Sequence, residues 1–278
     1  MKNKKSIFIC VIFYDNFNEI NSFMQEINSQ KNLEIHVAIT INKDTKENAY
    51  KLIRNWPKLD INLFDPKDNI GYLNGLFYAY EGLLHLGYTS DWTIFCNTDI
   101  EIPSKEFLKS FLSTNYEESI YCVAPSVYEK NRKVFENPQY KTRYSLKSLD
   151  RRIFIFSRPT MAKFYISLSK AKSKVRRSRE KEASCYVYSA HGSFFFLRNQ
   201  FLNEINRHYM SLMYSEEAFI AEEVRLKGKK IYYDAQLEVI HNESQSTGKL
   251  NMYKKSSYIA ESLKEIRKKY FISGDIKK

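Results

Sequence analysis

From residue 6 to residue 96 the chain alternates short, almost uninterrupted apolar runs with segments whose apolar residues recur every three or four positions. A run that is apolar throughout suits a strand of a parallel sheet with helices on both faces, and the recurrence at three or four suits those helices. The apolar runs are 6–14, 33–41, 61–64 and 92–96, and the helical segments are 17–27, 46–56 and 71–86. The alternation predicts an α/β fold with a mixed, mostly parallel sheet flanked by helices.

The length of 278 residues suits one α/β domain with an appended segment, and 21 tyrosines and 19 phenylalanines can fill its core. We predict the domain at residues 1–250 and a C-terminal helix within 251–278. Residues 140–184 are predicted to be a basic helical insertion in the domain, because they carry ten or more basic side chains and few acidic ones. The C-terminal helix has an apolar stripe of Ile259, Leu263, Ile266 and Tyr270. The stripe predicts packing on the core, with packing on another subunit as the alternative.

Within the insertion, Pro159 can begin an amphipathic helix. Its apolar face holds Met161, Phe164, Tyr165, Leu168 and Val175, and its other face holds Lys163, Lys170, Lys174 and Arg177, although Lys172 falls on the apolar side. Such a helix can lie in a membrane interface, and a solvated helix packed on its own domain is the alternative. Nucleic acid is disfavoured, because the aromatic residues are not interleaved with the cations. The net charge of +12 attracts phosphates, nucleic acids and anionic membranes alike.

Cysteine use and the N-terminus indicate the compartment. Cys10, Cys96, Cys122 and Cys185 are far apart and lack metal-ligand spacing, which predicts buried, reduced thiols in a cytosolic protein. The first apolar run is short and has no cleavage site after it, so we expect a strand and not a signal peptide. No run approaches the ~20 apolar residues that span a bilayer. Any membrane contact is expected to be peripheral, on the inner face of the plasma membrane.

Asn97, Thr98 and Asp99 directly follow the fourth apolar run. A carboxylate just beyond a buried strand can hold a divalent cation on a diphosphate, because such cations take oxygen ligands in fixed geometry. The same residue types also favour simple turns, so these three residues alone leave both interpretations open. Much later in the chain, a strand-like run over 230–240 leads to a single histidine, His241. A histidine in this position is most often structural.

The first turn of another predicted helix carries Glu216 and Glu217, with Ser215 placed as its cap. The two acids form a second candidate site. Acidic residues in a first turn also complement the helix dipole, so that interpretation stays open. Glu222 and Glu223, further along the same helix, are expected on the exposed surface.

Four blocks of sequence follow one another in a characteristic order. They are residues 12–16, Ile-Phe-Tyr-Asp-Asn; residues 69–72, Asn-Ile-Gly-Tyr; residues 97–99, Asn-Thr-Asp; and a long block that contains residues 191–196, 214–217, 225–228, 239–241 and 246–248. Together they cover roughly residues 6–250 and resemble the family 2 glycosyltransferases, which have the Rossmann-like GT-A fold. They resemble in particular the rhamnosyltransferase-like enzymes of bacterial polysaccharide assembly. Two departures are Thr40-Ile-Asn42, where the family commonly has Asp-Asn, and Glu216-Glu217, where it usually has Glu-Asp.

The resemblance implies roles for individual residues. Asp99 and His241 would hold Mg²⁺ or Mn²⁺ on the diphosphate of a nucleotide-sugar donor. Glu217 would be the general base that takes the proton of the acceptor hydroxyl, and Glu216 would orient the acceptor or support the base. The donor would be bound by Tyr14, Asn42, Asn69, Gly71, Asn97, His191 and Gly192. The reaction would be a single displacement with inversion at the anomeric carbon.

The resemblance also implies the partners of such an enzyme. They are a nucleoside-diphosphate sugar, a saccharide acceptor linked to polyprenyl diphosphate and the anionic inner-membrane surface, in the assembly of O-antigen, capsule or a similar polysaccharide. Nucleic acid is not among them. One alternative is a nucleotidyltransferase, which would favour a glycine-rich loop with lysine or arginine where residues 14–18 read Tyr-Asp-Asn-Phe-Asn. Another is a non-catalytic protein on a GT-A-like fold that binds membranes or saccharides.

Overall fold

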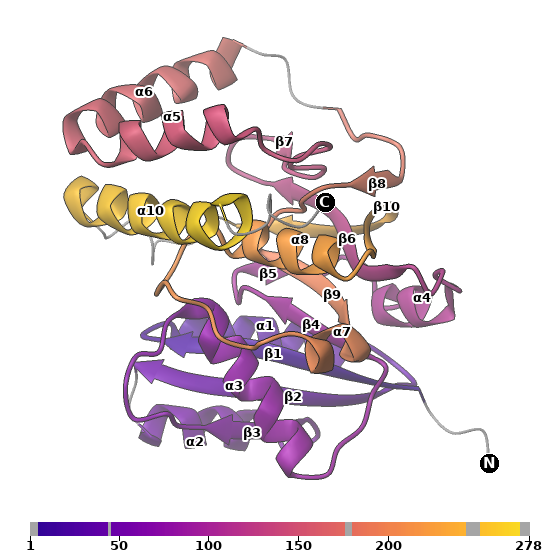
Figure 1. Cartoon of the computed structure of the whole chain (residues 1–278). Helices are drawn as coiled ribbons and strands as arrows, with labels where there is room; N and C mark the ends of the chain where they lie inside the picture. The colour runs from indigo at the N-terminus through magenta and orange to yellow at the C-terminus, as the bar shows by residue number, and fades with distance from the viewer. Residues whose placement is uncertain (1–4, 44–45, 176–179, 243–250, 273–278) are drawn as a thin grey trace.

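The computed structural model describes residues 5–43, 46–175, 180–242 and 251–272, so the predicted motif at 246–248 lies outside the described residues. At its centre is a ten-stranded sheet in the order β3-β2-β1-β4-β9-β6-β10-β5, with β7 paired to β6 and β8 paired to β10 (Figure 1). The strands are β1 (Ser6–Tyr14), β2 (Glu34–Lys43), β3 (Asp60–Phe64), β4 (Trp92–Cys96), β5 (Ile100–Glu101), β6 (Ile120–Glu129), β7 (Val134–Phe135), β8 (Cys185–Val187), β9 (Phe194–Arg198) and β10 (Lys230–His241). The helices are α1 (Phe17–Ser29), α2 (Lys46–Asn55), α3 (Tyr72–His85), α4 (Phe107–Ser113), α5 (Leu146–Phe156), α6 (Pro159–Val175), α7 (Asn199–Glu204), α8 (Glu216–Leu226) and α10 (Met252–Arg267), which a π-helical turn (Lys268–Ile272) extends.

The strands predicted from the first four apolar runs are all present. β3, β2, β1 and β4 run parallel to one another. β9 then runs antiparallel to β4 on one side and to β6 on the other, and β10 runs parallel to β6. The predicted fold class, a mixed and largely parallel α/β sheet with helices on its faces, is therefore confirmed.

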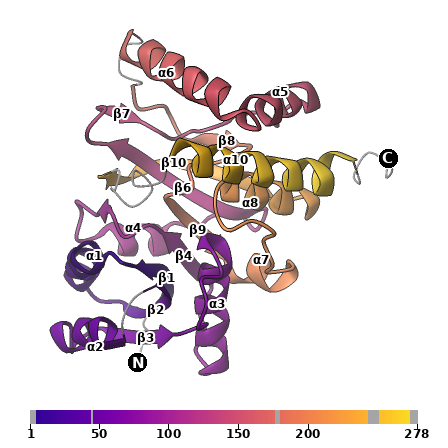
Figure 2. The same cartoon turned by 90° about the vertical axis from the view of Figure 1, so that its left-hand side faces the viewer.

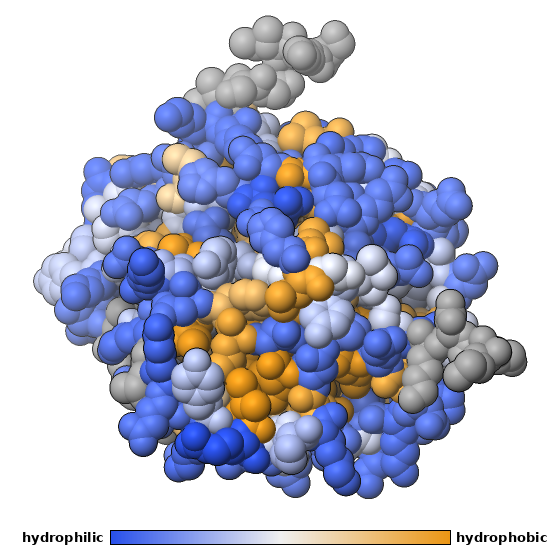
Figure 3. All heavy atoms as spheres, turned by 90° about the horizontal axis from the view of Figure 1, so that it is seen from below, coloured by the Kyte–Doolittle hydropathy of each residue, from blue (hydrophilic) through white to orange (hydrophobic). Residues whose placement is uncertain are grey.

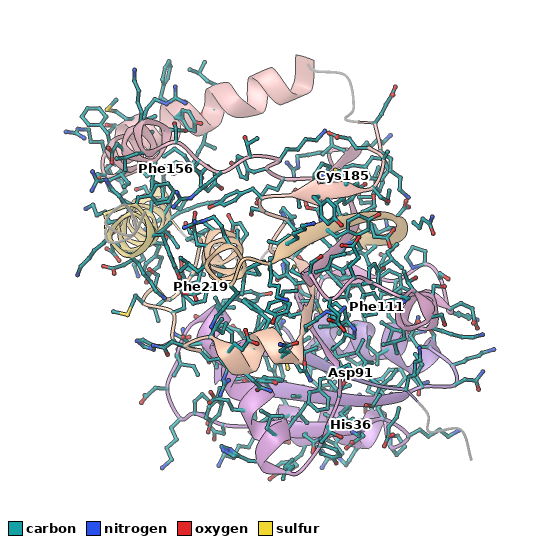
Figure 4. All side chains as sticks on the ribbon, turned by 45° about the vertical axis from the view of Figure 1, so that its right-hand side comes forward. His36, Asp91, Phe111, Phe156, Cys185 and Phe219 are labelled. Carbon is teal, nitrogen blue, oxygen red and sulfur yellow. The ribbon has the colours of Figure 1, made fainter. Side chains whose placement is uncertain are left out.

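The sheet separates two apolar cores. The odd-numbered residues of β1 from 7 to 13 face one core and the even-numbered residues from 8 to 12 face the other, as the alternation of side chains along a strand requires. Figure 4 labels an aromatic residue in each core, Phe111 of α4 and Phe219 of α8. The four cysteines are free thiols; Cys10, Cys96 and Cys122 are buried, as predicted, and Cys185 is half-buried.

The predicted insertion and the C-terminal helix pack together. α5 and α6 contact α10, and these three helices form the layer farthest from β3 (Figures 1 and 2). Leu263, Ile266 and Tyr270 are buried in the same core as Phe219, so packing of the C-terminal stripe on the core is confirmed. Among the described helices, none combines the length and the apolar character needed to cross a bilayer.

α6 begins at Pro159, as predicted, but several of its large apolar side chains are exposed. Phe164 is 67% exposed, and Met161, Tyr165 and Leu168 are each about two fifths exposed. The predicted helix residues Lys170, Lys172, Lys174, Val175 and Arg177 lie beyond the part of the helix whose side chains are described. The predicted apolar face therefore exists over the first turns of α6 and points toward solvent.

The opposite end of the molecule is the edge of the sheet at β3. All five residues of β3 are half-buried, because a neighbouring strand pairs with only one of its two edges. Figure 3 views this end and shows apolar side chains gathered near its middle, among hydrophilic ones.

Candidate functional site

The short strand β5 explains why Asp99 and His241 meet. β5 pairs antiparallel with the end of β10, which places Ile100 opposite His241. The Asn242 N–H donates to the Asp99 carbonyl oxygen at 3.0 Å and extends this pairing. As a result Asp99 Oδ2 lies 3.4 Å from His241 Nε2, and both side chains are buried. The structure thus brings together the two residues that the resemblance named as metal ligands.

The donor set of Asp99 and His241 fits one divalent cation. Two ligand atoms about 2.1 Å from the same ion, at about 100° to each other, are about 3.2 Å apart, close to the distance in the structure. Mn²⁺ accepts a carboxylate together with an imidazole, whereas Mg²⁺ prefers oxygen ligands. A carboxylate and an imidazole at this distance therefore suit a divalent cation.

A further carboxylate, Glu136, lies behind His241. Its Oε2 is 3.0 Å from His241 Nδ1 and 3.3 Å from His191 Nε2, and one ligand atom of each of the three residues lies within 4.8 Å of the others. Burial by itself would raise the pKa of Glu136, but the His241 hydrogen bond and nearby positive charges lower it to about 2. Burial would likewise lower the pKa of His241, but Asp99 and Glu136 raise it to about 10. His241 is therefore protonated between two carboxylates at neutral pH, and a cation bound at Nε2 would displace that proton.

Asn42 and Asn69 converge on Gly71, at the start of α3. Asn42 Nδ2 donates to the Gly71 carbonyl oxygen at 2.8 Å, and Asn69 Oδ1 accepts from the Gly71 N–H at 3.0 Å. Gly71 has a φ of +89°, and a Cβ here would lie 2.5 Å from the Leu212 carbonyl oxygen, so the position requires glycine. Asn42 Oδ1 is buried and has no hydrogen-bond partner among the described residues, so one acceptor beside Gly71 is unsatisfied. Tyr14 ends the adjacent strand β1 and is 40% exposed.

Asn97 is held rigidly at the end of β4. Its N–H donates to the Ser193 carbonyl oxygen at 2.9 Å, and its Oδ1 accepts from Tyr72 Oη at 2.7 Å. Burial is the main cause that raises the pKa of Tyr72, and negative charge from Glu216 and Asp99 adds to the rise. Tyr72 therefore lies between the candidate metal ligands and the acid pair as a neutral hydrogen-bond donor.

An unusual turn delivers Glu216 and Glu217 to the start of α8. Tyr214 and Ser215 have φ values of +70° and +63°, which are uncommon for residues with side chains and cluster at functional sites. Burial raises the pKa of both carboxyl groups, and the charge of Glu217 raises that of Glu216 further, to about 8. The Glu217 backbone and the charge of Arg152 oppose the rise at Glu217. Because the charge of Arg152 opposes the rise only at Glu217, Glu217 loses its proton more readily than Glu216.

His191 and Gly192 connect the metal ligands to the acid pair. The rings of His191 and His241 are 5.5 Å apart, and a Cβ added at Gly192 would lie 3.7 Å from Glu217 Oε2. A continuous wall thus runs from His241 to Glu217 at the end of the sheet where β4 and β10 finish. Asp99, His241, His191, Gly192 and Glu217 are brought together at this wall.

Three predictions about α8 are wrong. Ser215 stands at the N-cap but makes no capping hydrogen bond, because its left-handed backbone turns the hydroxyl toward Ser262 Oγ, 2.9 Å away. Glu222 and Glu223 are buried, at 0% and 7% exposure, and not on the surface. Glu222 accepts from Arg143, Arg225 and Tyr188, and Glu223 accepts from Lys269 and Tyr270. Most of these partners come from the insertion, from β8 and its following loop or from the C-terminal segment, so the pattern of α8 itself could not reveal them.

Two residues absent from the predicted set complete the wall. Glu136 lies behind both histidines, and Asn137 Oδ1 accepts from the His191 N–H at 2.7 Å. Both follow β7, which pairs with the end of β6 and so turns the chain back beside β10. The short apolar pair Val134-Phe135 is the only signal of this strand in the sequence, and no motif marks the two residues after it.

Comparison with proteins of known structure identifies structures with a similar fold. No family model matches the chain, and neither does any curated protein. The mannosyltransferase PcManGT from Pyrobaculum calidifontis, in complex with GDP-Man and Mn²⁺, is similar with a TM-score of 0.55 and 13% identity over 88% of this chain and 59% of that one. GalNAc-T7 with UDP, GalNAc and Mn²⁺ has a TM-score of 0.60 and 10% identity over 96% of this chain and 48% of that one. S. aureus TarS 1-349 in complex with UDP-GlcNAc has a TM-score of 0.55 and 12% identity over 90% of this chain and 64% of that one.

The likeness concerns the fold. The chain spans about half to two thirds of the length of these three structures. It shares with them the GT-A fold of glycosyltransferases, as the resemblance in the sequence implied.

Proposed function

We propose that this protein is an inverting, metal-dependent glycosyltransferase of the hexosyltransferase type, related to the rhamnosyltransferase-like enzymes of family 2. The observation that carries the proposal is the convergence of Asp99 and His241 with the acid pair Glu216 and Glu217 at one edge of a GT-A fold. The similar structures support it, because they hold GDP-Man, UDP or UDP-GlcNAc, and two of them hold Mn²⁺.

The donor is a nucleoside-diphosphate sugar bound along the ends of β1, β2 and β4. Asp99 and His241 would hold Mg²⁺ or Mn²⁺, which would supply Lewis-acid stabilisation of the diphosphate leaving group. Asn42 Oδ1 accepts from an N–H of the nucleobase, and Asn97 orients the ribose or the sugar. The rest of the donor contacts are assigned to Tyr14, Asn69, Gly71, His191 and Gly192.

Glu217 is the general base of the proposed reaction. It removes the proton of the acceptor hydroxyl while that oxygen attacks the anomeric carbon from the face opposite the diphosphate, so one C–O bond forms as the other breaks and the configuration inverts. Glu216, protonated up to about pH 8, donates a hydrogen bond that orients the acceptor or supports the base. If Glu217→Gln retained full turnover while Glu216→Gln lost it, the two roles would be reversed.

The acceptor is a saccharide linked to polyprenyl diphosphate, which the enzyme meets at the cytoplasmic face of the inner membrane during cell-surface polysaccharide assembly. Exposed apolar side chains on α5 and α6 support this location: Phe154 is 51% exposed and Phe164 is 67% exposed. The Arg158 guanidinium lies 3.7 Å from the centroid of the Phe154 ring and can turn toward lipid phosphates. The described part of the two helices contains one acid, Asp150, and Arg267 neutralises it. An apolar, cationic surface of this kind gains about 1 kcal/mol per cation near anionic lipid.

Co-sedimentation with liposomes tests the membrane contact. Phe154→Ser with Phe164→Ser should abolish binding to vesicles of phosphatidylglycerol and phosphatidylcholine at low salt. Leu86→Ser is the control, because Leu86 is 57% exposed but follows α3, away from the insertion. Failure of the wild type to co-sediment would count against the membrane contact and leave the transferase proposal standing.

Calorimetric titration tests the proposed function itself. UDP, TDP, GDP and CMP are titrated into the wild type and Asp99→Ala, with and without Mn²⁺. We expect one nucleotide to bind in the presence of Mn²⁺ and the mutation to abolish that binding. Asp91→Ala is the control, because Asp91 precedes β4 at the strand's other end (Figure 4). No binding of any nucleotide would favour a non-catalytic saccharide- or membrane-binding protein.

A further inference from the structure

Arg152, in α5, is a half-buried cation near the acid pair. Its guanidinium lies over the Tyr144 ring, 5.5 Å from the ring centroid. Among the residues whose side chains are described, no carboxylate lies within ion-pair distance of it. Arg143 of the same segment differs, because Glu222 binds it at 2.7 and 3.1 Å and neutralises it.

Hydrogen bonds to the backbone connect the segment that precedes Arg152 with Glu217. Tyr140 forms a β-bridge with Ser189, with N–H to carbonyl distances of 3.1 and 3.0 Å. Ser189 Oγ in turn donates to the Glu217 carbonyl oxygen at 3.4 Å. The Tyr144 ring then packs against the Tyr140 ring, with centroids 4.6 Å apart. Contacts through Ser189, Tyr140 and Tyr144 thus connect Glu217 with Arg152.

The charges of the two residues influence each other. The positive charge of Arg152 lowers the pKa of Glu217 against the larger effect of burial, and the negative charge of Glu217 is among the causes that raise the pKa of Arg152. Because charges interact strongly only over short distances in a partly wet site, this mutual effect agrees with the proximity that the contacts indicate.

We propose that Arg152, Tyr140 and Tyr144 form an acceptor subsite that binds an oxyanion, a phosphate or a carboxylate, carried by the acceptor saccharide. This inference rests on the proposed function and narrows its acceptor to an anionic saccharide. A guanidinium matches a carboxylate or a phosphate with two parallel hydrogen bonds, and tyrosine rings offer flat apolar faces with a polar tip to a sugar ring. An anionic ligand also offsets the cost of holding a cation half out of water without a carboxylate partner.

The subsite has a consequence for the base. An oxyanion on Arg152 offsets the positive charge that lowers the pKa of Glu217, so the pKa rises and Glu217 becomes a stronger base when the acceptor is bound. While the acceptor is absent, the charge of Arg152 is not offset and Glu217 is a weaker base. This limits transfer of the donor sugar to water.

Saturation-transfer NMR tests the subsite with glucose 1-phosphate, glucuronic acid and glucose as probes. The samples contain EDTA, because the proposed binding of a donor diphosphate requires metal and a sugar phosphate at that position would confuse the result. We expect at least one anionic sugar to bind about tenfold more tightly than glucose. Arg152→Gln should reduce its affinity to that of glucose, and Arg152→Lys should retain part of it. Arg151→Gln, an exposed neighbour on the same helix, should change the affinity less than twofold.

The two anionic probes separate the sources of the oxyanion. Binding of glucose 1-phosphate alone assigns the subsite to an acceptor phosphate, and binding of glucuronic acid alone assigns it to an acidic sugar. Equal binding of all three probes would overturn the subsite, and so would unchanged affinity of an Arg152→Gln protein with normal thermal unfolding. Nucleotide binding with Mn²⁺, measured on the same samples after metal is restored, shows separately whether the proposed function holds.

Discussion

Replacing Glu136 should weaken Mn²⁺ binding although the mutation leaves both candidate ligands in place. Glu136 Oε2 accepts from His241 Nδ1 at 3.0 Å, which keeps the proton on Nδ1 and turns the lone pair of Nε2 toward Asp99. Glu136 also stabilises the proton that competes for Nε2. Because Mn²⁺ carries the larger charge, the net effect of Glu136 favours the metal.

The magnitude follows from the burial of this contact. The Glu136 side chain is only 11% exposed, so water cannot fully replace its hydrogen bond. A hydrogen bond to a charged group contributes about 1.5–3 kcal/mol, which corresponds to about 10- to 100-fold in the dissociation constant for the metal. Glu136→Gln keeps an acceptor oxygen but loses the charge and should lie near the lower limit. Glu136→Ala loses both and should lie near the upper one.

The assay is titration of Mn²⁺ in the presence of the bound nucleotide, with the free ion followed by its electron paramagnetic resonance signal. Glu101→Gln is the matched control, since Glu101 accepts from Asn242 at 2.8 Å beside His241 but is more exposed. The control should change the dissociation constant less than twofold. A Glu136→Ala protein whose metal affinity stays within twofold of the wild type would refute the role of Glu136 in orienting His241.

Two further changes test the backbone and the acid pair. Gly71→Ala forces a Cβ to 2.5 Å from the Leu212 carbonyl oxygen and should lower the free energy of unfolding by about 2–4 kcal/mol in urea titrations. Gly228 is the control, because it also has a positive φ but a Cβ there would meet nothing within 4 Å. Gly228→Ala should lower the free energy of unfolding by about 1 kcal/mol. The pKa of Glu216 is raised in the folded state, to about 8, so the stability it contributes is present at low pH and is lost as the pH rises from about 4 to 8. Glu216→Gln removes this loss. At pH 8.5 the mutation should raise the free energy of unfolding relative to wild type by an amount on the order of 2 kcal/mol, with little gain at pH 4.5. An equal gain at both pH values would contradict the raised pKa.

The parts of the structure that a sequence pattern determines locally were predictable. Strands covered on both faces must be apolar at nearly every position, so the runs at 6–14 and 92–96 marked β1 and β4 without knowledge of their neighbours. Gly87, directly after the helical pattern of 71–86, follows the end of α3 with a φ of +85°, as a glycine in this position indicates. The positions of Asp99 and His241 at the ends of strands were predictable for the same reason, because a strand end is a local property.

The parts that depend on contacts between distant segments were not predictable. The burial of Glu222 depends on Arg143, whose place beside α8 depends on how the insertion returns across the sheet. Glu136 reaches His241 only because β7 pairs with β6 next to β10, and a two-residue strand leaves almost no pattern in a sequence. The left-handed turn at Ser215 was missed because serine before an acidic turn normally indicates a conventional cap.

The most direct test of the central claim is to follow a panel of nucleotide sugars by proton NMR with the protein and Mn²⁺, without an acceptor, until one donor is slowly hydrolysed. The proposed function predicts release of the nucleoside diphosphate from one donor, with the free sugar first appearing as the anomer opposite to that of the donor. The release should require the metal and be lost in Glu217→Gln. No release from any donor, or a first-formed sugar that retains the donor configuration, would contradict the assignment of an inverting glycosyltransferase.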